Sequence, residues 1–353
     1  MGAVRVAIIG ASGYTGAELL RLVLGHPKLE LGYAGAREKA GQRLGDVLPG
    51  TEGIAGLGER RLEAFEPGGA QALAERVDVA FSALPHAASA RVCQALLDAG
   101  IRVVDLSADF RLSSADVYEK WYGEHPAKEL ISRAVYGLPE LHRDELRGAR
   151  LIAAPGCYPT SSILPLAPLL SSDLIEHDGL VIDSKSGVSG AGRGAAANTH
   201  FPETSEGMRP YKVAGTHRHV PEIEQELSRV AGASIQVVFT PHLAPFSRGI
   251  LTTAYARAKA GVTVERCREA AESLYRDGLV TVLPAGRLPD TLWVRGSARA
   301  HVAYALDERS NMVVAMCAID NLAKGASAQA IQALNVCLGH PDALGLPMLG
   351  AFP

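Results

Sequence analysis

Apolar and polar positions follow two different patterns along this chain, and the first half repeats a strand and a helix. A β-branched run at 4–9 leads into a glycine-rich turn and then a segment with apolar residues at helical spacing, which stops before Pro27. Strand-like runs at 78–85 and 102–110 follow, with a helical pattern between them that ends at Gly100. This alternation predicts an α/β domain with a doubly wound parallel sheet, and ligands bind such sheets at the carboxyl ends of the strands.

The second half shows strand-like runs separated by loops, with fewer helical segments. This pattern predicts an α+β domain with a largely antiparallel or mixed sheet. A final helical segment at 320–339 is expected to pack back on the first domain. We therefore expect a first domain of 1–156, joined by 322–353, and a second domain of 157–321. The strand-like runs of the second half cover 179–196, 233–246, 249–259 and 311–322, and its helices cover 220–231 and 263–276.

Composition narrows the functional classes. The 353 residues are 47% hydrophobic and 21% charged, and the net charge of −3 gives no basic surplus of the kind typical of nucleic-acid or membrane-surface binding. No apolar run approaches the roughly 20 residues that span a bilayer, and the first residues read as a strand rather than a cleaved leader. Five widely spaced cysteines without a C-x-x-C pair argue against disulfides and structural zinc, so we expect a reducing cytoplasm.

The turn after the first strand has G-x-x-G-x-x-G spacing. Glycines let the backbone turn sharply and approach a pyrophosphate, whose charge is stabilised by amides at a helix N-terminus. The framing strand and helix therefore predict a Rossmann-like dinucleotide site, although a tight turn without a ligand is the alternative reading. The residues of this turn that we expect to contact the cofactor are Gly10, Ser12, Gly13, Tyr14, Thr15 and Gly16.

The end of the second strand-like run bears on the choice of cofactor. An acidic residue there would bind the ribose 2′-hydroxyl of NAD, but the chain instead has Arg37, with Lys39 close behind. A guanidinium can pair with a 2′-phosphate, so the sequence favours NADP. The alternative is that both residues are solvated loop cations.

The ends of the next two strand-like runs are expected to line the same crevice. Ser82 and Pro85 lie at the end of one of them and are expected to contact the cofactor, and Arg111 follows the other. His86 fits either this crevice or an exposed loop, and the sequence does not choose between them.

The stretch LIAAPGCYPTSSILPL, residues 151–166, places one cysteine among turn residues. Pro159 suits a first helical position, which would put Cys157 just before exposed helix amides. Such amides lower a thiol pKa and can stabilise an oxyanion, so we expect a nucleophile here. Pro165 and Pro168 predict that this helix is short or kinked. An inert buried cysteine is the alternative.

A base is expected from His217 and His219, directly before a helix that begins near Pro221. In an extended segment, residues two apart point the same way, so both imidazoles can face one cleft. One of them can also serve as a helix cap. A metal site would need a third ligand such as His200 or His242, and nothing at ligand spacing supplies one, so we expect no metal.

A glycine- and serine-rich loop with Arg193 inside it offers open amides to a phosphate or to a nicotinamide. We therefore expect cofactor contacts at Ser189 and Gly190. On its own, the loop could also be a flexible hairpin. It does not fit the G-x-S-x-G pattern, which makes a serine hydrolase a poor reading.

Taken together, these segments resemble the long form of the N-acetyl-γ-glutamyl-phosphate reductase family, and the resemblance covers nearly the whole chain. It implies a Rossmann-like domain followed by an α+β catalytic and dimerisation domain with a mixed sheet, as in the semialdehyde dehydrogenases. Related aspartate-semialdehyde dehydrogenases tend to have Asn before the cysteine, where this chain has Gly156. The motifs are GASGYTGAELLRL at 10–22, DLSADFRL at 105–112, YGLPEL at 136–141, PGCYPT at 155–160, SGVSGAGR at 186–193 and HRHVPEI at 217–223.

The resemblance implies a covalent route. Cys157 would attack an acyl phosphate to give a thioester, NADPH would reduce it, and His217 or His219 would assist with a proton, with a slight preference for His217. It also implies that Asn321 meets the nicotinamide amide. Arg111 and Arg193 are the candidates for binding substrate carboxylate or phosphate.

Two other functions stay open at this point. One is the related reductase of lysine biosynthesis, which takes an aminoadipyl phosphate on an acidic carrier protein, because one methylene gives only about 1–3 kcal/mol of discrimination. The other is a non-catalytic NADP-binding sensor, which would need neither the cysteine nor the paired histidines. We expect a homodimer or homotetramer.

Overall fold

The computed structural model describes residues 2–276 and 278–352 and divides the chain into two compact units. The first consists of Met1–Pro155 and Ala326–Leu346, and the second of Gly156–Gly325 and Pro347–Pro353. Of the C-terminal segment, Ala326–Leu346 belongs to the first unit. Its last residues belong to the second unit, where Ala351 N donates to Arg295 O at 2.8 Å.

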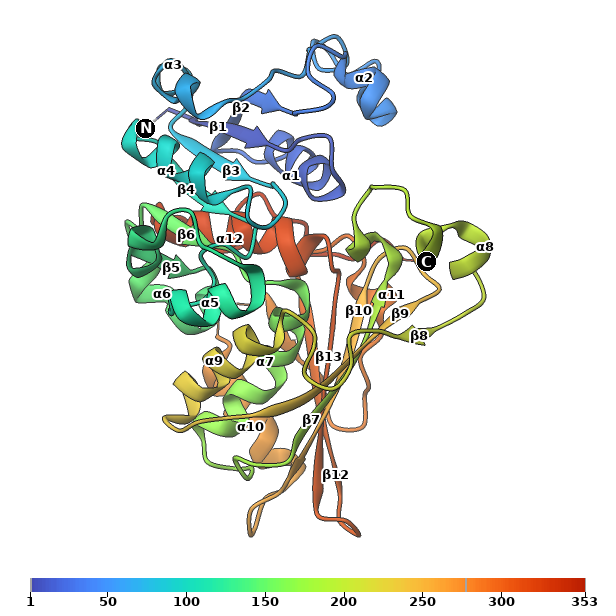
Figure 1. Ribbon diagram of the computed structural model, residues 1–353. Coiled ribbons are helices and arrows are strands. Elements are labelled where there is room, and N and C mark those ends of the chain that lie inside the picture. Colours follow the sequence, from blue (N-terminus) through green and yellow to red (C-terminus); the bar gives the residue numbers. More distant parts are fainter. Residues whose placement is uncertain (1, 277, 353) are drawn as a thin grey trace. The chain divides into compact units, whose positions relative to one another are not determined.

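The sheet of the first unit has six parallel strands in the order β2-β1-β3-β4-β6-β5 (Figure 1). Because β1 is flanked by β2 and β3, the chain reverses direction across the sheet at β1, which confirms the predicted doubly wound fold. The strands are β1 Val4–Ile9, β2 Leu29–Gly35, β3 Val79–Ser82, β4 Arg102–Asp105, β5 Ala134–Tyr136 and β6 Leu151–Ala153. The helices are α1 Tyr14–Leu24, α2 Leu44–Val47, α3 Ala70–Ala74, α4 Ala90–Asp98, α5 Ala115–Tyr122, α6 Pro139–Leu146 and α12 Ala328–Cys337.

Helix α12 is held in the first unit by both packing and polar contacts. Every residue of this helix is buried. Gln329 Nε2 donates to Gly137 O at 2.9 Å, and Asn335 Nδ2 donates to the carbonyls of Asp342 and Leu344. Side-chain amides thus satisfy backbone groups that burial would otherwise leave unpaired.

The second unit contains a mixed sheet of seven strands in the order β11-β12-β13-β10-β7-β9-β8. Neighbours are antiparallel except for the parallel pairs β7/β9 and β11/β12, as the loop-separated pattern predicted. The strands are β7 Leu180–Gly187, β8 Arg209–Pro210, β9 Val237–Ala244, β10 Ile250–Arg257, β11 Val280–Val282, β12 Ala300–Asp307 and β13 Met312–Ile319. The helices are α7 Cys157–Ser171, α8 Phe201–Thr204, α9 Val220–Ala231, α10 Val264–Leu274 and α11 Thr291–Val294, and a π-helical turn covers Ala323–Ser327.

Helices α7, α9 and α10 cover one face of this sheet (Figure 1). Strand residues on that face, such as Ile182 and Cys317, are fully buried. On the opposite face Val181, Val238 and Tyr255 remain 36%, 56% and 39% exposed. An apolar sheet face that stays open is a feature of surfaces that bind another protein.

The helix after the cysteine is 15 residues long, so of the two alternatives expected from its prolines, a short or a kinked helix, the short one does not hold. Proline at 168 removes the N–H that would bond to the carbonyl of Leu164. The hydroxyl of Tyr275 donates to that carbonyl at 2.6 Å instead, and both groups are buried. A tertiary contact therefore satisfies the group that the proline leaves open, which is why the helix continues.

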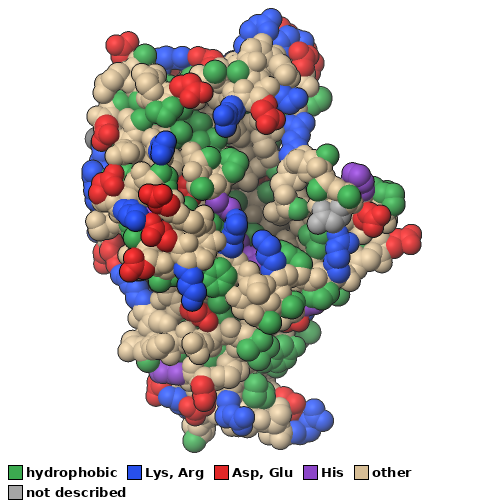
Figure 2. All heavy atoms as spheres, in the orientation of Figure 1, with side chains coloured by type: hydrophobic (Ala, Val, Ile, Leu, Met, Phe, Trp, Pro, Cys, Tyr) green, Lys and Arg blue, Asp and Glu red, His purple; other side chains and the backbone are tan. Residues whose placement is uncertain are grey.

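Within the described residues, no helix is both long and apolar enough to cross a membrane. Acidic and basic side chains are interspersed over the face of the molecule in Figure 2.

Candidate active site

The glycine turn of the first unit has the geometry that a dinucleotide site needs. Gly10 has φ +95°, and a Cβ there would lie 2.4 Å from Ala83 O. A Cβ on Gly16 would lie 2.2 Å from Gly10 O. Both positions therefore exclude a side chain. Gly13 caps α1 without a side-chain hydrogen bond, so the cradle at this helix N-terminus is built from backbone, which fits a pyrophosphate.

Arg37 and Lys39 lie directly after β2, and both side chains are exposed. This is the expected position at the end of the second strand, where the ribose of a dinucleotide lies when one is bound to such a sheet.

The two β3 strand-end residues expected to contact the cofactor, Ser82 and Pro85, differ in their surroundings. The Ser82 side chain is fully buried, and its hydroxyl lies 2.7 Å from that of Ser89. Ser89 in turn donates to Asp105 at 2.6 Å. The Ser82 hydroxyl is thus occupied inside the protein, while Pro85 is exposed. His86 is exposed as well, and its Nδ1 accepts a hydrogen bond from Ala108 N at 3.0 Å.

Asp109 organises this region, a role that the sequence did not predict. Its carboxylate is fully buried and accepts from the backbone amides of Ala87, Ser89 and Ala90, and from the hydroxyl of Tyr118 at 2.8 Å. The loop after β3 is therefore tied to the loop after β4. The sequence signal for this role was an acidic residue placed between the apolar residues Ala108 and Phe110.

Arg111, the expected substrate ligand, is buried. Its guanidinium donates to the carbonyls of Ala154 and Leu106, each at 2.8 Å. The structure thus gives it a bracing role that the sequence did not indicate, and substrate binding by Arg111 stays a prediction.

Cys157 is the first residue of α7, and Gly156 is the N-cap. The helix begins two residues earlier than expected, so Pro159 lies inside the first turn. Cys157 is half-buried, whereas the other four cysteines are buried. Burial raises the pKa of the Cys267 thiol to about 11 and raises the pKa of Cys93 and Cys317. Cys157 is therefore the thiol best placed to react.

A glycine lies directly against this cysteine. A Cβ on Gly325 would lie 2.9 Å from Cys157 Cβ and 3.3 Å from its Cα. Gly325 belongs to the π-helical turn, and its N–H donates to Asp320 O at 2.9 Å. Turns of this kind are frequent at functional sites.

His217 and His219 lie together, with ring centroids 4.8 Å apart. They lie in a turn rather than in the expected extended segment, and Lys212 and Ala214 just before them have positive φ. His219 N donates to His217 Nδ1 at 3.1 Å, so the proton of a neutral His217 ring is on Nε2. His219 is also the N-cap residue of α9.

Aromatic rings enclose His217. The rings of Tyr158, Tyr211 and Phe239 have centroids 5.3–5.6 Å from that of His217. Burial, together with the nearby charges of Lys212 and Arg218, lowers the pKa of His217 to about 4. This imidazole is therefore neutral at physiological pH.

Two tyrosines, also missed from the sequence, connect the thiol to the histidines. Tyr158 follows the cysteine, and its hydroxyl donates to His242 O at 3.1 Å and accepts from Tyr211 at 3.0 Å. Burial raises the pKa of Tyr211 to about 12, with a smaller contribution from the nearby charge of Cys157, and the hydrogen bond to Tyr158 acts in the opposite direction. Both tyrosines and the imidazole pair thus form one cluster, and Cys157 adjoins it through its chain neighbour Tyr158.

Asn321 anchors the serine- and glycine-rich loop through hydrogen bonds. Asn321 is 2% exposed, and its Nδ2 donates to the Ser189 hydroxyl at 2.9 Å while its Oδ1 accepts from Gly249 N at 2.7 Å. The expected nicotinamide ligand therefore holds this loop in place. Gly190 and Arg193 are exposed on it.

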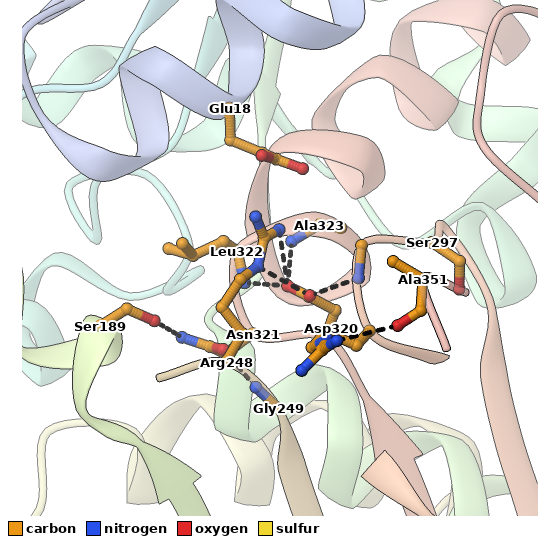
Figure 3. Close-up of polar contacts among 12 residues, drawn as sticks. Glu18, Ser189, Arg248, Gly249, Ser297, Asp320, Asn321, Leu322, Ala323 and Ala351 are labelled. Carbon is orange, nitrogen blue, oxygen red and sulfur yellow. Dashed lines mark hydrogen bonds and ion pairs between the residues drawn. The ribbon is translucent and has the colours of Figure 1, made fainter. Parts of the chain in front are cut away.

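Asp320 is the centre of a second buried network, shown in Figure 3. Its fully buried carboxylate pairs with Arg248 at 2.8 and 3.0 Å. It also accepts from the backbone amides of Gly296, Leu322 and Ala323. This network fixes the chain immediately before the turn that contacts Cys157.

Within 2–276 and 278–352, no group of three His, Cys, Asp or Glu side chains is arranged to hold a metal ion. His242, one of the possible third ligands, instead lies 3.4 Å from Asp183.

Comparisons with known proteins agree with this geometry. Residues 5–149 match the family described as semialdehyde dehydrogenase, NAD binding domain, and residues 157–321 match semialdehyde dehydrogenase, dimerisation domain. Relatives named N-acetyl-gamma-glutamyl-phosphate reductase include one from Syntrophobacter fumaroxidans, 50% identical over 97% of both chains. Another, from Desulfotalea psychrophila, is 45% identical over 99% of this chain and 100% of its own. The chain belongs to the N-acetyl-γ-glutamyl-phosphate reductase family.

Solved structures show the same fold at lower identity. Aspartate semialdehyde dehydrogenase II from Vibrio cholerae superposes with a TM-score of 0.71 at 17% identity, over 95% of this chain and 98% of that one. The Candida albicans aspartate semialdehyde dehydrogenase with NADP gives 0.68 at 16% identity, over 95% and 98%. The family assignment confirms the resemblance, and the shared architecture confirms the predicted fold class.

Proposed function

We propose that this chain reduces N-acetyl-L-glutamyl 5-phosphate to N-acetyl-L-glutamate 5-semialdehyde and phosphate with NADPH, as a step of arginine biosynthesis. The observation that supports this most directly is the half-buried Cys157 at the start of α7, in one site with Tyr158 and the imidazole pair. The names of the relatives supply the substrate.

The proposed reaction begins at the sulfur of Cys157. The Cys157 thiolate attacks the acyl carbon, the carbon–oxygen bond to phosphate breaks, and the acyl group is held as a thioester. A reduced nicotinamide, when bound, would supply the hydride that the thioester carbonyl accepts. The carbon–sulfur bond then breaks, which releases the aldehyde and restores the thiolate.

His217 and His219 are proposed to carry out the proton transfers of the reaction. A neutral His217 can donate through Nε2 because its Nδ1 is engaged by His219 N. We assign the hydrogen bond to the developing oxygen to His217, and proton uptake from the thiol to the pair. His217→Asn and His219→Asn, compared by kcat and its pH profile, separate the two roles, since only the acid–base residue should remove a limb of the profile.

We propose that the cofactor is NADP, held by the turn 10–16 and by Arg37 and Lys39. The glycine cradle fits a pyrophosphate, and the two exposed cations fit a 2′-phosphate. Ser189 and Gly190 are proposed to face the nicotinamide, with Asn321 holding their loop, and Arg193 is proposed to bind substrate anions.

The assay that tests the function is phosphate-dependent NADP reduction with N-acetylglutamate semialdehyde, run beside the one-carbon-longer aminoadipate analogue. A larger kcat/KM for the glutamate compound supports the proposal, and a larger value for the analogue would favour the lysine-biosynthesis enzyme. A protein that binds NADP but turns over neither would be a sensor.

We also propose a homodimer or homotetramer that uses the open sheet face with Val181, Val238 and Tyr255. Light scattering on the purified protein, with Val238→Glu as the disrupting variant, tests this. A cytoplasmic location is proposed as well, because the mechanism requires Cys157 to stay reduced.

A further inference from the structure

One buried carboxylate links the helix of the nucleophile to the helix of the histidines. Glu222 lies in the first turn of α9 and is 2% exposed. Its Oε1 accepts a hydrogen bond from Gly156 N at 2.8 Å. Gly156 is the N-cap of α7, so the acceptor lies one residue before Cys157. A buried carboxylate is costly unless hydrogen bonds or charges satisfy it, and this backbone amide is one of the groups that do so.

The same short segment carries the imidazoles. His219 is the N-cap residue of α9, and its carbonyl accepts from Ile223 N at 3.0 Å. His217 is joined to it through the bond between His219 N and His217 Nδ1. Helices α7 and α9 also pack against each other. Glu222 is therefore rigidly connected to the histidines on one side and to the nucleophile's N-cap on the other.

We infer that Glu222 is a positioning residue that fixes the Cys157 thiol relative to the imidazole pair. The assignment rests on the proposed function, because the position of the thiol matters only if it is the nucleophile. Its negative charge has a second consequence. A carboxylate beside the start of α7 offsets part of the positive end of the helix and so disfavours the thiolate.

Charge and position can be separated by two variants. Glu222→Gln keeps an acceptor oxygen for Gly156 N and removes the charge, whereas Glu222→Ala removes both. The matched control is Glu226→Gln, one turn further along α9 and equally 2% exposed, whose carboxylate accepts from the Gln225 side chain at 2.8 Å. Circular dichroism and melting temperature establish folding for all three.

The readouts are steady-state kinetics and the pH dependence of Cys157 alkylation by iodoacetamide. We expect Glu222→Ala to lower kcat about 10- to 100-fold with both KM values nearly unchanged, because the thiol is misplaced rather than the ligands released. We expect Glu222→Gln to retain most of kcat and to shift the alkylation profile about one pH unit lower. Glu226→Gln should match the wild type in both.

The inference is overturned if both Glu222 variants match Glu226→Gln in kcat and in alkylation. If Glu222→Ala does not fold, the Glu222→Gln profile decides, and a wild-type profile overturns the inference. A wild-type protein that turned over no acyl phosphate would refute the proposed function, yet the alkylation comparison would still decide the role of Glu222.

Discussion

Adding one methyl group at Gly325 should disturb the nucleophile directly. The new Cβ would lie 2.9 Å from Cys157 Cβ, and ordinary contacts begin at 3.4–4 Å, so the two segments must separate by about 0.5–1 Å. The other close atom, Asp320 O at 3.3 Å, belongs to a residue held by five hydrogen bonds to its carboxylate and resists movement. We therefore expect Cys157 to be the side that moves.

A displacement of this size is large for covalent chemistry. A misplacement of about 1 Å can reduce turnover about 100-fold, so we expect Gly325→Ala to lower kcat by about 10- to 100-fold. Overpacking should also reduce the free energy of unfolding by about 1–3 kcal/mol. The KM for NADPH should change little, because the glycine turn of the first unit is not altered.

Steady-state kinetics with both substrates, together with the iodoacetamide alkylation rate, checks this. Gly207→Ala is the matched control, because a Cβ there meets nothing within 4 Å. The steric argument is refuted if Gly325→Ala and Gly207→Ala have the same kcat and alkylation rate while both are folded.

Three further predictions concern the thiol, the cofactor and stability at acid pH. Cys157→Ser should abolish turnover while the Kd for NADP, measured by calorimetry, stays nearly unchanged; full activity would exclude a covalent route. Arg37→Ala should raise the KM for NADPH more than tenfold and leave that for NADH nearly constant, since a bidentate phosphate contact contributes about 1.5–3 kcal/mol. His301 is 7% exposed, and burial followed by the charge of Arg299 lowers its pKa to about 4. Because the unfolded chain binds this proton near pH 6.5, stability should be full above pH 6.5 and fall by about 3 kcal/mol between pH 6.5 and 4. Chemical denaturation of His301→Leu should show a loss smaller by that amount, and an identical pH dependence would contradict the assignment.

Features that depend on neighbouring residues could be predicted from the sequence. The turn 10–16 could be predicted because it needs glycine wherever the backbone approaches itself. The position of Cys157 could be predicted because it depends only on the strand before it and the helix after it. The strand–helix alternation likewise fixed the parallel sheet. Each of these signals lies within about 20 residues, where spacing and residue type carry the information.

Contacts between distant residues could not be predicted in the same way. Asp320 binds Arg248 across 72 residues, and Glu222 binds Gly156 across 66. The turn before the histidines has left-handed backbone at Lys212 and Ala214, two residue types that do not favour it. Such features arise from tertiary packing, which overrides local preference.

The hydrogen bond from Tyr275 to the Leu164 carbonyl, which Pro168 leaves without a helical partner, constrains the order in which these residues can be substituted in evolution. Proline at 168 is harmless only while a hydroxyl reaches Leu164 O, and without it a buried carbonyl is left unsatisfied, which costs about 1–3 kcal/mol. The tyrosine without the proline meets no such penalty. Among descendants of one ancestor, we therefore expect the aromatic hydroxyl to be acquired before the imino acid and to be lost after it.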